Sequence, residues 1–421
     1  MPAGLAARRG AWRALGLVRE GRPFDQALDE ALAGLPDRDR RLAYALAAGT
    51  LRSAGALDLA IAPHVTAGFE RVPHTLRDLL RLGAYQLTAL DRVPPHAAVS
   101  TSVALARESS GRRTAGFVNA VLRRVAEQAP RVVPGRGSHP GWLVSRWTRR
   151  FGPEETARLL RWNDSPPHLA VQPARWSRER LVERWTAANI AVETAPWDAG
   201  LRPGISRPPD LPGYEEGGFV VQDPAQRLIM DFFAVPEHAL AYDACAAPGG
   251  KAIAAGAVAR LVVAGERRQE RVLRLRANLA RAGSGHEHVV RADASLPPLR
   301  SVDLVLLDVP CLGTGVFAKH PDARWRARPE ALERLVAQAG AMLRGSAEVV
   351  RPGGLLCFST CSLEPEENEV QIEAFLAGDP RFHRDPGPAP AELLTAAGDF
   401  QSLPQRHSVD GAYAARLRRT G

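Results

Sequence analysis

The chain has 421 residues and a formal net charge of +9, with 45% hydrophobic and 24% charged residues. These values are ordinary for a soluble globular protein of two or three domains. They exclude a membrane-spanning or disulfide-rich exported chain, because no apolar stretch or signal core is long enough and the four cysteines all lie between 245 and 361. We therefore expect a cytoplasmic protein without a membrane partner.

The positive charge is concentrated in the first third of the chain. Residues 1–140 contain 20 arginines against 12 aspartates and glutamates, whereas the remaining residues contain 35 basic against 34 acidic side chains. A basic domain joined to a nearly neutral one indicates a polyanion-binding module beside a catalytic module. An arginine-rich solvated surface without a partner gives the same counts.

The first predicted elements are helices, which form an all-α domain over residues 1–135. Apolar residues recur at helical spacing in several stretches, the clearest being 25–32, 40–47, 75–87 and 116–124. Prolines separate these stretches. Arg123 and Arg124 end the last helix, where they could contact RNA or complement the helix dipole.

A stretch rich in Pro, Gly and Arg at 130–141 predicts a domain boundary. The following residues, 136–220, are interpreted as this linker and a small α+β domain. Its expected helices are 154–162 and 178–188, and its expected strands lie near 169–173 and 219–221.

Strands and helices alternate over the rest of the chain, residues 221–421. The expected strands are 239–244, 260–265, 288–292, 302–308, 353–360 and 412–417, and the clearest helices are 267–282 and 330–350. This alternation predicts a Rossmann-like, doubly wound α/β domain, which binds ligands at the carboxyl ends of its strands.

A glycine-rich turn lies at the centre of this domain, in Asp243-Ala-Cys-Ala-Ala-Pro-Gly-Gly-Lys251. Glycine lets the backbone approach a ligand closely, and the start of the next helix offers unpaired N–H groups. The spacing differs from G-x-G-x-x-G and from the G-K-[ST] of a phosphate loop, because Ala252 follows Lys251. A nucleotide-like ligand without a pyrophosphate therefore fits better than NAD or ATP, unless the turn only closes a βα unit.

Carboxylates stand at the ends of three expected strands, as Glu266, Asp293 and Asp308. Glu266 lies 16 residues after Gly250, near the spacing at which a carboxylate binds a ribose hydroxyl. Each residue alone could be a helix N-cap or a turn residue. Three around one glycine turn favour an adenosine-bearing ligand, and S-adenosylmethionine satisfies this pattern without a pyrophosphate.

Two cysteines follow the fourth and fifth strands, as Cys311 and Cys361. Carbon-5 of cytosine is a poor nucleophile, so an enzyme that methylates it first adds a thiolate to carbon-6. A second group can then assist product release. Cys245 and Cys357 are interpreted as buried and inert. A metal site is not expected, because no pair has C-x-x-C spacing.

Local chemistry leaves open which of these two cysteines attacks. A Pro-Cys dipeptide after the fourth strand is where DNA cytosine-5 methyltransferases keep their nucleophile, and Cys311 stands there. Three glutamates, at 364, 366 and 367, disfavour a thiolate at Cys361, while Asp308 does the same for Cys311.

Three motifs in order, D-x-C-A-A-P-G-G-K, D-x-P-C-x-G-T-G-V and S-T-C-S-x-x-P-E-E-N-E, resemble the NOL/NOP/Sun family of RNA cytosine-5 methyltransferases. The helical stretch ending in F-V-N-x-V-L-R-R resembles an RNA-binding NusB-like domain. The resemblance implies a class I methyltransferase with Cys361 as nucleophile, Cys311 in product release and Asp308 holding the protonated cytosine ring. It implies that S-adenosylmethionine is bound by Cys245, Ala246, Ala247, Pro248, Gly249, Gly250, Lys251, Glu266, Asp293 and Asp308.

The resemblance further implies RNA rather than DNA as the partner, most directly 16S ribosomal RNA. Two alternatives stay open, a transfer-RNA cytosine-5 methyltransferase and a non-catalytic RNA-binding assembly factor. Glu266-Arg267-Arg268 replaces the usual D-x-D/N element, which bears on cofactor affinity. Neither the target nucleotide nor the oligomeric state follows from the sequence.

Overall fold

The computed structural model describes residues 4–91, 93–128, 135, 137–205 and 207–421, and the protein divides into two compact units. The first comprises Met1–Pro166 together with Phe317–Arg326, and the second comprises Pro167–Val316 together with Ala327–Gly421. A ten-residue segment from the second half of the chain thus belongs to the first unit.

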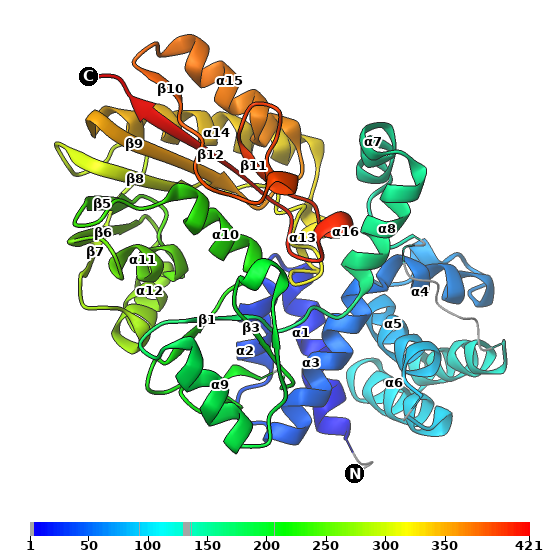
Figure 1. The fold of residues 1–421 in the computed structure, drawn as a ribbon. Helices are drawn as coiled ribbons and strands as arrows, with labels where there is room; N and C mark the ends of the chain where they lie inside the picture. Colours follow the sequence, from blue (N-terminus) through cyan, green and yellow to red (C-terminus); the bar gives the residue numbers. More distant parts are fainter. Residues whose placement is uncertain (1–3, 92, 129–134, 136, 206) are drawn as a thin grey trace. The chain divides into compact units, whose positions relative to one another are not determined.

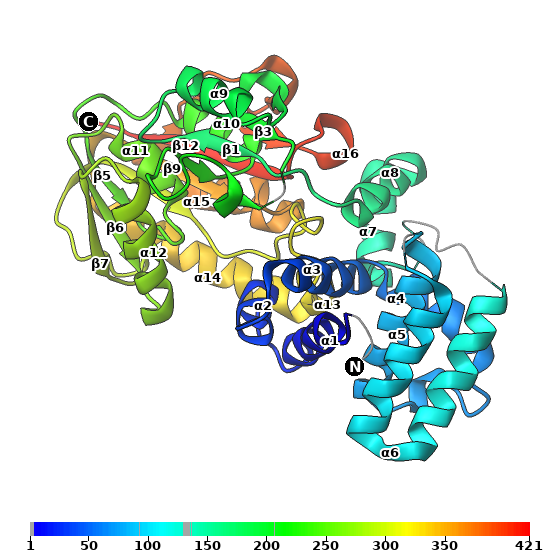
Figure 2. The ribbon, with the colours of Figure 1, turned by 90° about the horizontal axis from the view of Figure 1, so that it is seen from below.

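The first unit is helical throughout its described residues, apart from short connections (Figure 2). Its helices are α1 Leu5–Arg19, α2 Phe24–Ala31, α3 Asp37–Arg52, α4 Ala54–Ile61, α5 His74–Ala89, α6 Pro95–Gln128, α7 Gly141–Phe151, α8 Pro153–Asp164 and α13 Ala323–Arg326. Gly111 has a φ of 84° and breaks α6 into two helical halves. Glycine adopts this conformation without the steric cost of a side chain.

Alanine and leucine fill the core of the first unit. Leu79, Leu80 and Leu82 of α5 are fully buried, and so are the alanines at 47 and 48 of α3. The short alanine side chains let helices pack closely, which explains a core with few aromatic residues. The all-α prediction for this part is confirmed, whereas the predicted linker at 130–141 lies largely outside the described residues.

No single helix among the described residues is both long and apolar enough to cross a membrane. One bent pair of helices, Asp37–Arg52 with Ala54–His64, meets that criterion only when the two are taken together.

The second unit begins with a small antiparallel sheet in the order β2-β3-β1-β4. Its strands are β1 Val171–Pro173, β2 Val192–Thr194, β3 Leu201–Pro203 and β4 Phe219–Val221, and its helix is α9 Arg178–Ala187. Trp185 of α9 packs edge-on against Phe219 of β4, with ring centroids 5.5 Å apart. Strands β2 and β3 were not predicted, because three residues are too few to show alternation.

The second sheet of this unit has eight strands, with the order β10-β12-β9-β8-β5-β6-β7 and with β11 paired to β12. Its strands are β5 Leu240–Asp243, β6 Leu261–Glu266, β7 Glu287–Arg291, β8 Val302–Asp308, β9 Val350–Thr360, β10 Phe382–Arg384, β11 Phe400–Ser402 and β12 Ala412–Arg419. Strands β5 to β9 run parallel, and β12 is antiparallel to β9. The predicted α/β domain is confirmed.

Helices cover both faces of this sheet (Figure 1). One face packs against α10 Pro224–Phe233, α11 Gly250–Gly256 and α12 Gln269–Ala282, and the other against α14 Pro329–Glu348 and α15 Glu369–Gly378. Since β5, β6, β8 and β9 are parallel neighbours, their carboxyl ends lie along one edge of the sheet. The residues that follow these strands therefore lie together.

Candidate functional site

The glycine-rich turn connects β5 to α11. Gly249 has a φ of 118°, which an L side chain rarely adopts. The Ala246 N–H donates to the Gly265 carbonyl at 2.9 Å, joining the turn to the end of β6. From α12, Arg271 donates to the Ala247 carbonyl at 2.6 Å and Asn278 to the Pro248 carbonyl at 2.8 Å. The turn is therefore held in one shape from two sides.

Asp243, at the end of β5, carries a buried carboxylate that the protein leaves open. The residue is 1% exposed, and neither carboxylate oxygen has a hydrogen-bond partner among the described residues. Burial raises the pKa of Asp243 to about 7, although nearby Lys251 opposes the shift. Because a buried unpaired acceptor is costly, these oxygens call for a ligand that donates hydrogen bonds or carries positive charge. S-Adenosylmethionine, which has an ammonium and a sulfonium group, fits that requirement.

Two further carboxylates lie at this edge of the sheet. Glu266 is the last residue of β6, and Asp293 follows the end of β7. Glu266 is 4% exposed, accepts from the Arg268 N–H at 2.8 Å and pairs with Arg271 at 3.3 Å. Asp293 accepts from the backbone N–H and hydroxyl of Ser295, which lowers the pKa of its carboxyl group. Asp293 therefore stabilises a local turn, as one of its two sequence interpretations predicted. The other interpretation, that it binds the cofactor, stays a prediction.

Lys251 and Asp308 form an ion pair beside the turn, with Nζ and Oδ2 2.7 Å apart. The lysine side chain is 8% exposed and the aspartate 37%, so the carboxylate is the accessible partner. Ser359 of β9 donates to the other oxygen of Asp308 at 3.0 Å. Gln226 of α10 accepts a further hydrogen bond from Lys251 and had no signal in the sequence.

The two cysteines meet at the carboxyl ends of β8 and β9. The sulfur atoms of Cys311 and Cys361 are 3.3 Å apart, although 50 positions separate the residues. The pKa of the Cys311 thiol is raised, first by its hydrogen bond to Cys361 and then by burial. A thiol that stays protonated can donate to a neighbouring thiolate, so Cys311 suits an assisting role.

Glu367 lies next to this cysteine pair. The sequence analysis named it only as an acidic neighbour of Cys361. It is 1% exposed, and its Oε1 accepts from the Leu312 N–H at 2.9 Å. Its charge contributes to the raised pKa of Cys311, a role that the sequence suggested for Asp308. Burial raises the pKa of Glu367 itself to about 7. The sequence signal for this residue was its position in the P-E-E run that follows Cys361.

Burial also raises the pKa values of the thiols of Cys245 and Cys357. Cys357 is fully buried within β9, where it contributes to the apolar core. Within the described ranges, no group of three or more His, Cys, Asp or Glu side chains is arranged to hold a metal ion.

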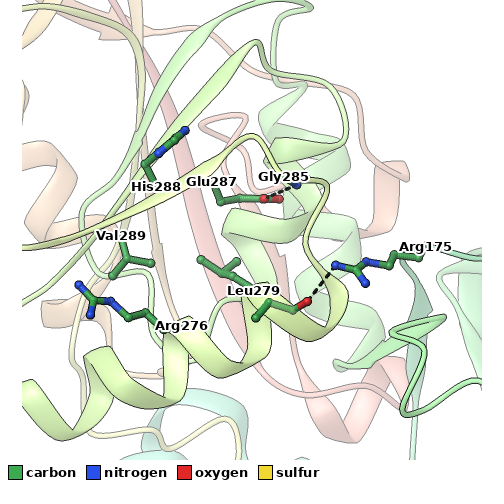
Figure 3. A pocket seen from close by; sticks show the side chains of 8 residues that line it. Arg175, Arg276, Leu279, Gly285, Glu287, His288 and Val289 are labelled. Carbon is green, nitrogen blue, oxygen red and sulfur yellow. Dashed lines mark hydrogen bonds between the residues drawn. The ribbon is translucent and has the colours of Figure 1, made fainter.

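A cavity of about 410 Å³ lies elsewhere in the second unit, between the end of α12 and the start of β7 (Figure 3). Arg175 donates to the Ala280 carbonyl at its rim, and Glu287 accepts from the Gly285 N–H. It contains none of the predicted site residues. Since it adjoins the amino end of β7, whereas α/β sheets bind ligands at the carboxyl ends of their strands, we assign it no part in the site.

Comparison with known proteins shows the family of this chain. The family described as 16S rRNA methyltransferase RsmB/F matches residues 231–418, the NusB family matches 5–127, and the RsmF/B ferredoxin-like domain matches 139–202. The chain is 32% identical to the probable ribosomal RNA small subunit methyltransferase B of Synechocystis, across 94% of this chain and 95% of that protein. It is 33% identical to the corresponding methyltransferase of Vibrio cholerae, across 95% and 94%.

The chain belongs to the RsmB family of 16S rRNA methyltransferases. Its fold resembles that of PH0851, with a TM-score of 0.84, 22% identity and 99% of both chains covered. It also resembles NSun6 from Pyrococcus horikoshii, solved with SFG, with a TM-score of 0.61, 18% identity, 67% of this chain covered and 98% of that one. The RsmB family match covers every predicted site residue, from Cys245 to Cys361.

Proposed function

We propose that this member of the RsmB family transfers a methyl group from S-adenosylmethionine to carbon-5 of a cytosine in 16S ribosomal RNA. The observation that carries the proposal is the pair of thiols 3.3 Å apart, at the same sheet edge as the turn that contains the buried, unpaired Asp243. The first arrangement suits covalent attack on a pyrimidine, and the second suits a cationic cofactor.

The cofactor would be held by the turn residues 245–251 and by carboxylates. S-Adenosylmethionine supplies an electrophilic methyl group when bound. Asp243 offers two open acceptors, while Glu266 at the end of β6 would bind the ribose and pairs with Arg271. Glu266 carries one methylene more than an aspartate would, so its carboxylate extends further from the strand. Asp293 is a further candidate to bind the cofactor. The oxygen that would do so is Oδ2, which lies 3.5 Å from Nη1 of Arg267.

Cys361 would add as a thiolate to carbon-6 of the cytosine, forming a carbon–sulfur bond and making carbon-5 nucleophilic. Asp308 would hold the protonated ring nitrogen, since its carboxylate is partly exposed and Lys251 and Ser359 orient it. After methylation a solvent water would accept the proton from carbon-5, the carbon-5–carbon-6 double bond would re-form, and the Cys361 thiolate would leave carbon-6. Cys311, at 3.3 Å, would assist that release by hydrogen-bonding the departing Cys361 sulfur.

RNA binding is proposed for the helical part, residues 1–135, with 136–220 as a small second domain and 221–421 as the methyltransferase domain. A cavity of about 660 Å³ along α6 supports this, because hydrogen-bond donors line it, including His96, Arg107, Asn119 and Arg123. Guanidinium groups and amides are suited to phosphates and base edges. We propose a cytoplasmic location, because the proposed substrate is ribosomal RNA.

Incubation with labelled S-adenosylmethionine tests the proposal. We expect label in 16S rRNA, in the form of 5-methylcytosine mapped by bisulfite sequencing, and little or none in transfer RNA. Preferential labelling of transfer RNA would change the substrate. A protein that binds RNA and cofactor without transferring label to either RNA would contradict the catalytic assignment.

A further inference from the structure

The segment Phe317–Arg326, here called the strap, interrupts the second unit and belongs to the first. Only five residues separate it from Cys311, and the chain rejoins the second unit at Ala327. The loop that carries one of the two paired thiols is therefore continuous with a segment that folds into the helical unit.

Arg324 anchors the strap. The side chain is fully buried, and its two terminal nitrogens donate to carbonyl oxygens of residues from three regions of the first unit. The partners are Arg52 O at 3.2 Å, Ser138 O at 3.2 Å, Asn163 O at 2.7 Å, Phe317 O at 3.2 Å and the Asp164 carboxylate at 2.6 Å. Few side chains could replace Arg324 here, because this set of acceptors requires a planar group with several donors.

Further contacts hold the rest of the strap. Arg52 of α3 donates twice to the Ala318 carbonyl, at 3.2 and 3.1 Å. The Trp325 indole donates to the Leu51 carbonyl at 3.2 Å. Phe317 is fully buried, with its ring 6.2 Å from that of Trp147 in α7. The strap is thus part of the core of the first unit.

The five residues between Cys311 and the strap are held equally firmly at their other end. Leu312 donates to Glu367, Gly315 donates to the Cys361 carbonyl at 3.0 Å, and Val316 turns back to the Gly313 carbonyl at 3.1 Å. Five residues span at most about 18 Å when fully extended, and this turn shortens them. Little slack remains between the thiol pair and the strap.

We propose that the strap couples the helical unit to the cysteine loop, with Arg324 as a positioning residue for Cys311. The unit that binds the RNA then also positions the loop that carries Cys311. The inference rests on the proposed function for its catalytic consequence, but the link between Arg324 and the Cys311 loop is independent of any reaction.

Arg324→Ala and Arg324→Lys test the coupling, with Arg328→Ala as the control. Arg328 is exposed and follows the strap by two residues, in the second unit. We expect iodoacetamide to alkylate Cys311 at least threefold faster in both Arg324 variants than in the parent. Peptide mass spectrometry measures this rate. We expect kcat for RNA methylation to fall at least tenfold for Arg324→Ala and less for Arg324→Lys. The affinity for S-adenosylmethionine should stay within twofold, and Arg328→Ala should match the parent in every measurement.

A folded Arg324→Lys protein with parental alkylation and parental kcat would overturn the coupling. If the parent does not methylate RNA, the proposed function fails, and alkylation alone decides the coupling. If neither Arg324 variant folds, native-state hydrogen exchange of the full-length parent decides. Amides of 312–316 and 317–326 should then open together at the same free energy as denaturant is raised. Separate opening of the two stretches would overturn the proposal.

Discussion

The two units of this protein treat buried charge in opposite ways. In the helical unit Arg324 is completely buried, yet it is paired with Asp164 at 2.6 Å and surrounded by carbonyl oxygens. In the α/β unit Asp243 is buried to the same degree, but both of its carboxylate oxygens lack a partner among the described residues. The chain supplies partners for both terminal nitrogens of Arg324, although its Nε has none among the described residues, and supplies none for the two oxygens of Asp243.

This difference separates groups that stabilise the fold from groups that await a ligand. Breaking a buried ion pair destabilises its unit, because removing one partner strands the other. A buried carboxylate without a partner destabilises the ligand-free protein and gains its partner only on binding. Substitutions in the two environments should therefore affect stability and activity in opposite proportions.

The largest expected effect is on chemistry alone. Cys361→Ala should abolish methyl transfer and form no covalent RNA adduct, because the attacking thiolate is lost. Cys311→Ala should still attack and methylate but fail to release, so a protein–RNA complex that resists denaturant should accumulate on gels. Thermal unfolding should show both variants close to the parent. A trapped complex with Cys361→Ala instead would reverse the two roles.

The next effect is on stability alone. Asp164→Ala leaves the guanidinium of Arg324 buried without its counter-charge, which should cost about 3–5 kcal/mol of unfolding free energy. Denaturant titration measures this cost, and cofactor affinity of the folded fraction should be unchanged. Asp210→Ala is a suitable control, since Asp210 pairs with Arg207 at an exposed position. Equal stability of Asp164→Ala and the control would break the comparison.

Asp243→Asn should weaken S-adenosylmethionine by about 1–3 kcal/mol, the usual cost of losing a good acceptor for a ligand polar group. It should not lower the stability of the ligand-free protein, because the wild-type carboxylate has no partner to lose. Isothermal calorimetry and denaturant titration provide the two values. Unchanged affinity would remove Asp243 from the cofactor site.

The pH dependence sharpens the same contrast. The pKa of Asp243 is about 7 in the folded protein, against about 3.9 for an unperturbed aspartate. Between these values the folded state retains a proton that the unfolded chain has lost, so stability falls as pH rises from about 4 to about 7. The stability of Asp243→Asn relative to the parent should therefore increase across this window and level off above it. A constant difference from pH 4 to 8 would contradict the raised pKa.

Glu266→Ala and Asp308→Ala should each weaken S-adenosylmethionine by about 1–3 kcal/mol, because each removes a polar partner of the proposed cofactor. The exposed Arg351, which pairs with Asp303 away from the predicted site residues, provides the control variant Arg351→Ala. Calorimetry with unchanged affinity in both acidic variants would reject the cofactor assignment of these residues.

The smallest effect is expected on the surface of the helical unit. Arg123 and Arg124 of α6 are exposed, and replacing both with alanine should reduce the salt dependence of RNA binding by a slope of about 1 for each lost phosphate contact. Arg276→Ala, an exposed arginine of α12, should leave the slope unchanged. An unaltered slope in the double variant would mean that these two charges are only solvated surface.

The sequence by itself determined the elements that local patterns encode. Helical periodicity located α5, and long apolar runs located β8 and β9, because the period of side-chain burial is set within one element. The glycine turn was found because only a few residue types suit its backbone. Strands of three residues contain too few positions for a period to show, and of these β1 and β4 were predicted whereas β2, β3, β10 and β11 were missed.

Only the tertiary structure decided which distant residues meet. The sequence predicted that Cys311 and Cys361 follow the fourth and fifth strands of the domain, but their 3.3 Å separation depends on how β8 and β9 pair. Gln226 beside Lys251, and Arg324 beside Asp164 at a separation of 160 positions, left no local trace. Such contacts arise from the packing of whole elements, which local periodicity does not encode. For that reason the strap was read as part of the α/β domain, whereas its hydrogen bonds belong to the helical unit.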